Sequence, residues 1–209
     1  LTELSQQAAE KVQWLYDTFG LTIDTIDRDM LATTASSLTC TNGSPTAPLL
    51  NAPELDTAVQ TLKNQDAQPI TEMIAPSTGQ GTTPVMPSFV GIIHTELWTV
   101  LKGLPGFVEP KNYASRNDMF PGEVGKTDGI RWIETSRGYK SGSNYYLPIL
   151  GQDAYGNVKI PGGEKVLGFK PAETAGSEMD RYSVMYWKSN YVSRILDDLN
   201  MLTLICTRT

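Results

Sequence analysis

The sequence of 209 residues predicts an α+β fold, in which helices and strands are segregated along the chain rather than alternating as βαβ units. Three observations predict it: a long helical pattern at the start, short helices and strands mixed through the middle, and two strand-like runs at the end. The chain is long enough, and at 40% hydrophobic residues apolar enough, to bury a core in one or two domains.

Residues 1–20 have the spacing of an amphipathic helix. Apolar side chains recur every three or four positions and share one helix face: Leu1, Leu4, Ala8, Val12, Leu15 and Phe19. Gly20 is placed to stop or bend this helix, and a second helical pattern over 23–31 favours continuation as one rod. Residues 39–53 are rich in turn formers, which indicates a boundary between structural regions.

The middle of the chain predicts short elements. Residues 54–64 are expected to form a helix, because Asn51 offers a cap at its start. Residues 89–93 are a continuous apolar run with β-branched side chains, which predicts a buried strand. A further helix is expected to begin at His94 and to end at Gly103.

The second half predicts mainly strands. Residues 130–135 and 144–151 have strand composition, and residues 152–156 are interpreted as a helical turn. Two strand-like runs over 182–196 and 202–207, joined by an Asp-rich turn, predict a β-hairpin at the C-terminal end.

The formal net charge of −6 is distributed unevenly. Residues 1–50 carry −4, residues 51–120 carry −3 and residues 121–209 carry +1. A nucleic-acid reader presents a basic stripe, so this balance argues against one. Two interpretations stay open: the acidic side chains serve solubility, or the acidic region of one copy meets a less acidic region of another.

Cys40 and Cys206 stand far apart in the sequence and match neither a disulfide framework nor a metal knuckle. We therefore expect free buried thiols and a reducing compartment. No run of eighteen apolar residues predicts a membrane span, and the start of the chain has a helical pattern rather than that of a signal peptide. The sequon Asn42-Gly43-Ser44 is interpreted as a plain turn.

The stretch 122–129, GEVGKTDG, contains Gly-Lys-Thr, the end of a phosphate-binding P-loop. A complete P-loop has glycine five residues before the glycine of Gly-Lys-Thr, and Phe120 occupies that position here. A β-branched and aromatic strand follows in place of a helix, and Asp128 would repel phosphate. The sequence thus predicts no nucleotide site here, and the pair Gly79/Gly81 is a weaker candidate still.

His94 is the single histidine, so any Ser-His-Asp or Cys-His relay would have to use it. Its place after a buried strand favours a structural role as a cap or hydrogen-bond partner. The carboxylate pairs Asp27/Asp29 and Asp197/Asp198 have solvated surroundings, and neither stands out as a glycosidase pair. The sequence therefore assigns no catalytic, cofactor-binding or metal-ligating residue, and we expect a protein without a cofactor that is not an enzyme.

Six short motifs follow one another in a characteristic order: Ile93-His94-Thr95-Glu96, Tyr113-Ala114, Gly122-Glu123-Val124-Gly125, Gly129 to Thr135, Gly151 to Gly156, and Trp187-Lys188. In this order they resemble the major capsid proteins of tailed bacteriophages, most closely the family typified by coliphage N-four. The resemblance covers residues 88–209 and, more loosely, 1–64. Thr95 stands where that family has proline, and it offers a hydroxyl cap to the helix.

The resemblance implies the Hong Kong 97-like capsid fold. Its peripheral domain would combine a spine helix in residues 1–49 with C-terminal strands in 178–209, and its axial domain would span 50–177. In that family an N-terminal arm and an extended loop precede the long helix, and by the resemblance we expect no counterpart of them in this sequence. By the same resemblance, GEVGKTDG is a turn that feeds a strand, and Lys126 is an exposed charge.

The function implied is that of a major capsid protein, which self-assembles through pentamers and hexamers into an icosahedral head shell around phage DNA. Its partners would be copies of itself, portal, scaffolding or decoration proteins, and DNA bound non-specifically at the inner face, with no membrane. It would assemble in the host cytoplasm and reside in the virion. The alternatives are an encapsulin-type nanocompartment shell protein and, from a different class, a monomeric hydrolase or carbohydrate-binding module.

Overall fold

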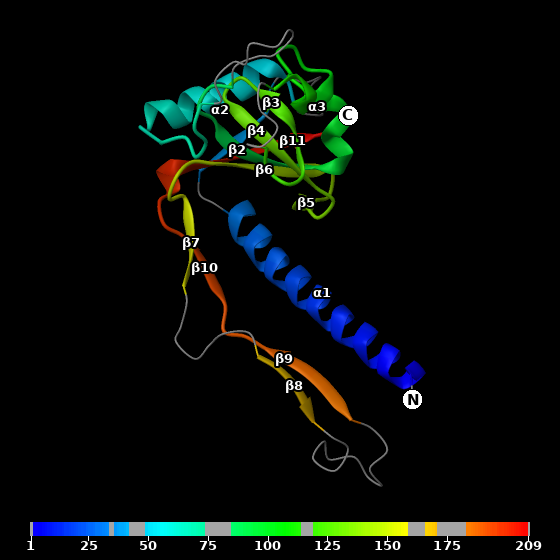
Figure 1. Ribbon diagram of the computed structural model, residues 1–209. Coiled ribbons are helices and arrows are strands. Elements are labelled where there is room, and N and C mark those ends of the chain that lie inside the picture. The colour runs from blue at the N-terminus through cyan, green and yellow to red at the C-terminus, as the bar shows by residue number, and fades with distance from the viewer. Residues whose placement is uncertain are drawn as a thin grey trace. The chain divides into compact units, whose positions relative to one another are not determined.

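The structure is a computed structural model that describes residues 2–33, 36–41, 49–73, 85–113, 119–158, 166–170 and 183–208, with side chains from residue 10 onward. The chain divides into two compact units (Figure 1). The first, here called the helical unit, comprises residues 1–27 and 157–194. The second, the sheet unit, comprises residues 28–156 and 195–209.

Helix α1 (Thr2–Ala32) is one continuous helix, as the two helical patterns predict. It does not stop at Gly20, where a side chain would meet no atom within 4 Å. Threonine is tolerated in this helix because its hydroxyl donates to the carbonyl one turn back. Thr18 donates to the oxygen of Trp14 and Thr22 to that of Thr18, each at 2.8 Å.

Two short antiparallel strands, β8 (Val166–Lys170) and β9 (Val184–Lys188), form a two-stranded sheet in the helical unit. The ring of Phe19 in α1 meets that of Trp187 edge-on, with the ring centroids 5.1 Å apart. A second two-stranded sheet consists of β7 (Tyr155–Val158) and β10 (Val192–Ile195).

The sheet unit contains one mixed seven-stranded sheet. Six of its strands follow the order β1-β11-β6-β2-β4-β3, and the seventh, β5, pairs with β6. The β1–β11 and β2–β4 pairs are parallel, and the other pairs are antiparallel. The strands are β1 (Ser37–Thr39), β2 (Phe89–His94), β3 (Glu123–Thr127), β4 (Ile130–Thr135), β5 (Lys140–Ser141), β6 (Asn144–Leu150) and β11 (Met201–Thr207).

Helix α2 (Ala52–Asn64) supplies one side of the core of the sheet unit (Figure 1). Asn51 caps it as predicted, because its Oδ1 accepts from the N–H of Glu54 at 3.1 Å. The helix buries Leu55, Ala58, Val59 and Leu62 in one cluster with the sheet. Among its described residues, the unit also contains three 3-10 turns and one short helix: η1 (Thr95–Leu97), α3 (Trp98–Lys102), η2 (Pro110–Asn112) and η4 (Asp198–Asn200).

The predicted C-terminal hairpin is wrong. A 3-10 turn does separate β10 from β11, but the two strands belong to different sheets: β10 pairs with β7, whereas β11 pairs with β6 and β1. The helical turn predicted at 152–156 is also wrong, since Tyr155 begins strand β7 after a turn at 152–153. In both cases distant partners decide the structure of a segment whose local pattern is ambiguous.

The structural units divide the chain after residues 27, 156 and 194. The expected peripheral and axial domains divide it after residues 49 and 177. In the structure, β11 belongs to the large sheet rather than to the unit that contains most of α1. The assignment of peripheral and axial roles stays a prediction.

Candidate functional site

The GEVGKTDG stretch is mostly strand. Residues 123–127 are β3, and only Gly122 and residues 128–129 of the stretch are turns, so the prediction of a turn that feeds a strand is wrong for most of it. The N–H of Lys126 donates to the carbonyl of Val108 at 3.0 Å, so it does not point at a phosphate. Lys126 is half-buried rather than exposed, and burial lowers the pKa of its ammonium group.

Gly125 is required by the close approach of a neighbouring segment. Its φ is +154°, and a Cβ there would lie 2.4 Å from the ring of Phe107 and 2.8 Å from the carbonyl oxygen of Val108. A β-bulge between Glu123 and Gly125 accompanies this approach. Gly125 therefore serves packing of the segment at 107–108 against β3.

A buried ion pair joins β3 to β4. The carboxylate of Glu123 accepts from Arg131 at 2.9 and 2.5 Å, from the hydroxyl of Tyr113 at 2.9 Å and from the N–H of Phe120 at 3.0 Å. The Arg131 guanidinium also lies 4.6 Å from the centroid of the Phe120 ring. Burial, followed by the neighbouring carboxylate, raises the pKa of Tyr113. The cluster is rich in internal partners, so it ties Tyr113 and Phe120 to the sheet.

Sequence reasoning missed this cluster, although a signal was present. Arg131 stands inside the apolar run Ile130-Arg131-Trp132-Ile133, and a charged residue within a buried strand needs a partner. The partner lies within the Gly-Glu-Val-Gly motif, where only the glycines were interpreted.

His94 has the structural role that the sequence predicts. Its Nδ1 accepts from the N–H of Glu96 at 3.1 Å and so caps η1, and its ring meets that of Tyr145 edge-on. The predicted Thr95 cap is wrong, because His94 takes that position. Glu96 accepts from Tyr145 and from Lys140, and these two hydrogen bonds lower the pKa of its carboxyl group.

The remaining candidate carboxylates have structural partners. Asp27 accepts from the hydroxyl of Tyr191 at 2.7–2.8 Å, and Asp29 pairs with Arg28 at 2.6 Å. Asp197 caps η4 by accepting from the N–H of Leu199 at 2.9 Å. The Gly79/Gly81 pair and the sequon at 42–44 lie outside the described residues.

In the described ranges, no three His, Cys, Asp or Glu side chains gather closely enough to hold a metal ion. No helix in the part of the chain that the structure describes has the length and apolarity to cross a membrane.

Cys40 and Cys206 are free and buried, as predicted. Both belong to the main core cluster of the sheet unit, where Cys40 directly follows β1 and Cys206 lies in the adjacent strand β11. Their adjacency was not predictable from their separation in the sequence.

The helical unit lacks a buried apolar core among its described residues, because every buried apolar side chain of the described chain lies in the sheet unit. Large apolar side chains are instead exposed, with Trp14 67% and Phe169 58% accessible. The exposed apolar set of the helical unit comprises Val12, Trp14, Tyr16, Leu21, Ile26, Val158, Val166, Phe169, Val184, Tyr186 and Val192. Surface of this kind is typical of a contact with another molecule.

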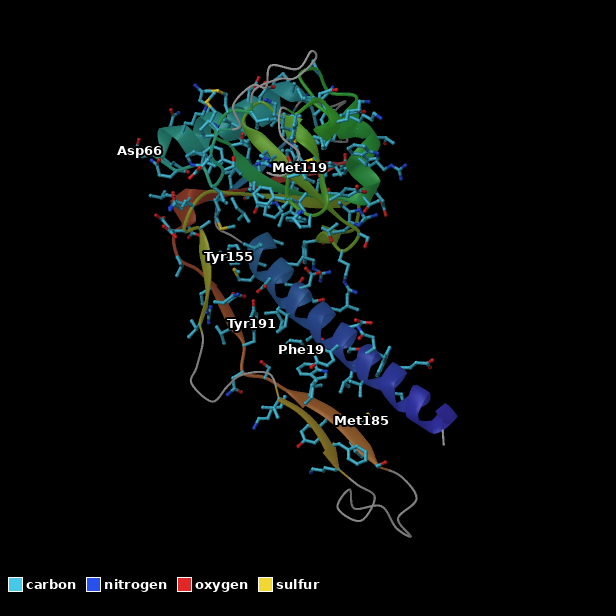
Figure 2. All side chains as sticks on the ribbon, viewed as in Figure 1. Phe19, Asp66, Met119, Tyr155, Met185 and Tyr191 are labelled. Carbon is cyan, nitrogen blue, oxygen red and sulfur yellow. The ribbon has the colours of Figure 1, made fainter. Side chains whose placement is uncertain are left out.

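A shallow groove of about 390 Å³ lies within the helical unit, between α1 and the β8–β9 strands. Figure 2 shows Phe19 on α1 and Met185 on β9. The groove is lined by Lys11, Trp14, Leu15, Phe169, Ser183 and Met185. The contact between α1 and the β8–β9 pair therefore leaves apolar side chains uncovered at the edge of this contact.

The antiparallel pair β8–β9, here called the hairpin, has two faces. Trp187 lies on the face that contacts Phe19 of α1, and the opposite face is here called the outer hairpin face. The strand register places six residues on this outer hairpin face: Val166, Gly168, Lys170, Val184, Tyr186 and Lys188. The ring of Tyr186 covers Gly168 so closely that a Cβ there would lie 2.3 Å from it. The ammonium of Lys170 lies 5.8 Å from the centroid of the same ring. The outer hairpin face thus combines an exposed apolar patch with two positive charges.

Comparison with known proteins gives no match to a family model and none to a curated protein. Solved phage structures are similar in fold. A chain of the head structure of Helicobacter pylori bacteriophage KHP40 aligns with a TM-score of 0.59 and 12% identity, over 97% of this chain and 68% of that one. A chain of the capsid structure of cyanophage P-SCSP1u aligns with a TM-score of 0.56 and 13% identity, over 96% and 66%.

This chain has the fold of phage capsid chains. A chain of Mycobacterium phage Che8 also aligns, with a TM-score of 0.51 and 14% identity over 90% of this chain and 60% of that one. The present chain spans between 60% and 68% of the length of these three relatives. The α+β class and the capsid-type fold expected from the sequence are confirmed.

Proposed function

We propose that this protein is a structural protein, the major capsid protein of a tailed phage, whose copies assemble into an icosahedral head shell around DNA. The observation that carries the proposal is the helical unit, in which none of the described apolar side chains is buried and eleven large ones are exposed. An isolated helix derives most of its stability from packing of its apolar face, so such a unit is expected to gain stability from a neighbouring copy. The capsid-type fold supports the same proposal.

Charge complementarity points to the surfaces involved. Residues 1–27 contain five acidic and one basic side chain, whereas residues 157–194 contain four acidic and six basic ones. On α1 the exposed acids Glu10 and Asp17 lie among exposed apolar residues. In the proposed shell, this acidic face of one copy meets the outer hairpin face of the next. Many such weak contacts, repeated by symmetry, give a stable shell.

The finer features of the proposal follow from the resemblance stated above. The shell is of the Hong Kong 97-like type, with pentamers and hexamers of this chain, and it assembles in the host cytoplasm and resides in the virion. Portal, scaffolding or decoration proteins are further partners. An overall acidic chain suits a wall around DNA packaged inside, because it makes only weak, non-specific contacts with phosphates. The protein acts without catalysis.

Charge reversal tests the proposal. Particle formation by the purified protein is measured by electron microscopy and mass photometry. Reversing the outer hairpin face (Lys170→Glu with Lys188→Glu), or the helix (Glu10→Lys with Asp17→Lys), is expected to prevent assembly. Combining all four substitutions restores complementarity and is expected to restore part of the assembly.

Two controls accompany this experiment. Trp14→Glu is expected to block assembly by placing a charge on the exposed apolar surface, whereas Trp14→Phe, which keeps the apolar contact, is expected to assemble. Salt at about 0.5 M should weaken assembly, because it shortens the screening length to a few ångströms. Wild-type protein that stays monomeric in every condition would overturn the proposal, and particles unaffected by either charge reversal would overturn the assigned surfaces.

A further inference from the structure

The two cysteines of the chain occupy directly opposed positions in the sheet. Strands β1 and β11 are parallel, with Thr39 opposite Ile205. The N–H of Cys40 donates to the carbonyl of Ile205 at 2.9 Å. In a pair of parallel strands, the N–H of one residue donates to the carbonyl of the residue that precedes its register partner. The bond from Cys40 to Ile205 therefore continues the register by one step and places Cys40 opposite Cys206.

Opposed residues on adjacent strands are close enough for a disulfide. Neighbouring strands lie about 4.8 Å apart, and disulfides join Cα atoms that are roughly 4.4–6.8 Å apart. Side chains of residues in register point to the same face of the sheet. Cys40 and Cys206 also belong to the same buried cluster. The backbone therefore places both thiols on one side of the sheet within bonding range.

The reactivity of the pair depends on opening of the edge of the sheet. Cys40 is 2% and Cys206 0% exposed, and the Cys40 thiol, together with burial, raises the pKa of Cys206. Thiolate is therefore scarce while the edge is closed. However, β1 has only three residues and is the outermost strand of the sheet. Release of this short strand exposes both thiols at once.

We infer that Cys40 and Cys206 form an oxidative modification site, a dithiol that a small-molecule disulfide such as oxidised glutathione converts into an internal disulfide between β1 and β11. One cysteine thiolate attacks the small disulfide, releases one equivalent of thiol and leaves a mixed disulfide. The second thiolate displaces the second equivalent, so two cysteine thiols are oxidised and one small disulfide is reduced.

The bond joins the edge strand covalently to the strand beside it and closes a loop that contains most of the chain. Such a loop restricts the unfolded state strongly and so stabilises the folded one. This inference concerns the sheet unit alone and does not depend on the proposed assembly. Within the proposed function, the thiols stay reduced in the cytoplasm and oxidise after release, which would strengthen each subunit outside the cell.

The test is refolding of the full chain from denaturant in buffer containing oxidised glutathione, so that burial does not limit access. The expected product is a monomer whose intact mass is lower by two hydrogen atoms and which has no maleimide-reactive thiol. Its unfolding temperature should rise on the order of 10 °C above that of the reduced protein, and a dithiol reductant should reverse the rise.

Cys40→Ser and Cys206→Ser are the matched controls, and each is expected to stop at the mixed disulfide with glutathione. Wild-type protein that refolds with both thiols free, or that stops at glutathione adducts, would overturn the inference. An internal disulfide that lowers the unfolding temperature would overturn it as well, because the bond would then conflict with the native sheet. None of these readouts depends on particle formation.

Discussion

Arg131 binds Glu123 through two hydrogen bonds, Nε to Oε1 at 2.9 Å and Nη2 to Oε2 at 2.5 Å, across the antiparallel pair β4 and β3. The side chains are only 3% and 0% exposed. Removing two charges from water is costly, and the cost is offset here by paired geometry and by the additional donors Tyr113 and Phe120.

Removal of either charge from this pair is expected to destabilise the protein strongly. Arg131→Met leaves the carboxylate of Glu123 buried without its counter-charge, so the free energy of unfolding should fall by about 3–5 kcal/mol. Denaturant titration followed by tryptophan fluorescence measures this change. Arg28→Met is the control, because the Arg28–Asp29 pair is more exposed and should contribute about 1 kcal/mol or less. Equal losses in the two variants would contradict the assigned role.

Gly125, the glycine of the Gly-Lys-Thr tripeptide, is expected to tolerate no side chain. Gly125→Ala combines a positive φ with a Cβ 2.4 Å from the Phe107 ring, so the segment at 107–108 must move away from β3. Gly142→Ala is the matched control, since it has a φ of +61° but open space around the new methyl group. Gly125→Ala should lose about 1–3 kcal/mol more than this control in denaturant unfolding. A nucleotide-dependent rise in the unfolding temperature of the wild type would contradict the packing role.

Glu109 is expected to make stability depend on pH in the acid range. Hydrogen bonds from Lys111 and then Lys102 lower the pKa of its carboxyl group from 4.5 to about 2. Because the folded-state pKa is the lower one, its contribution is complete above pH 4.5 and is lost as the pH falls towards 2. Glu109→Gln should therefore flatten the pH dependence of the unfolding midpoint in that window.

A direct measurement separates Glu109 from the other acids. The carboxyl carbon signal of Glu109 can be followed by NMR titration of the labelled protein. In Lys111→Ala the pKa of Glu109 should move up towards 4.5, because its first donor is removed. A titration midpoint near 4.5 in the wild type would contradict the ion pairs of the structure.

Local patterns predicted elements whose structure depends on nearby residues. The Asn51 cap, the strand at 130–135 and the His94 cap follow from side-chain chemistry within a few positions. The C-terminal hairpin was not predictable in this way. The strand β11 is buried on both faces, as at Leu202 and Thr203, which is typical of an interior strand whose partners come from distant segments.

The candidate site likewise has features that the local sequence predicts and features that depend on distant residues. The spacing of glycines alone predicts no P-loop at 122–129, because that motif depends on local backbone geometry. The Glu123–Arg131 pair and the opposed Cys40 and Cys206 depend on strand register, and register was not specified by the sequence pattern alone. Among the exposed apolar residues of α1, Val12 and Ile26 belong to the two helical patterns that predicted a packed face, so their exposure emerged only from the structure.

The place of β11 between β1 and β6 has a consequence for biosynthesis. Residues 37–39 and 144–150 leave the ribosome long before residues 201–207, which must insert between them. Until that insertion, both earlier strands expose unpaired backbone groups, which favour pairing with other chains. Premature termination ahead of Met201 would therefore remove β11 and also leave β1 without the strand that it pairs with, so the loss exceeds that of one edge strand.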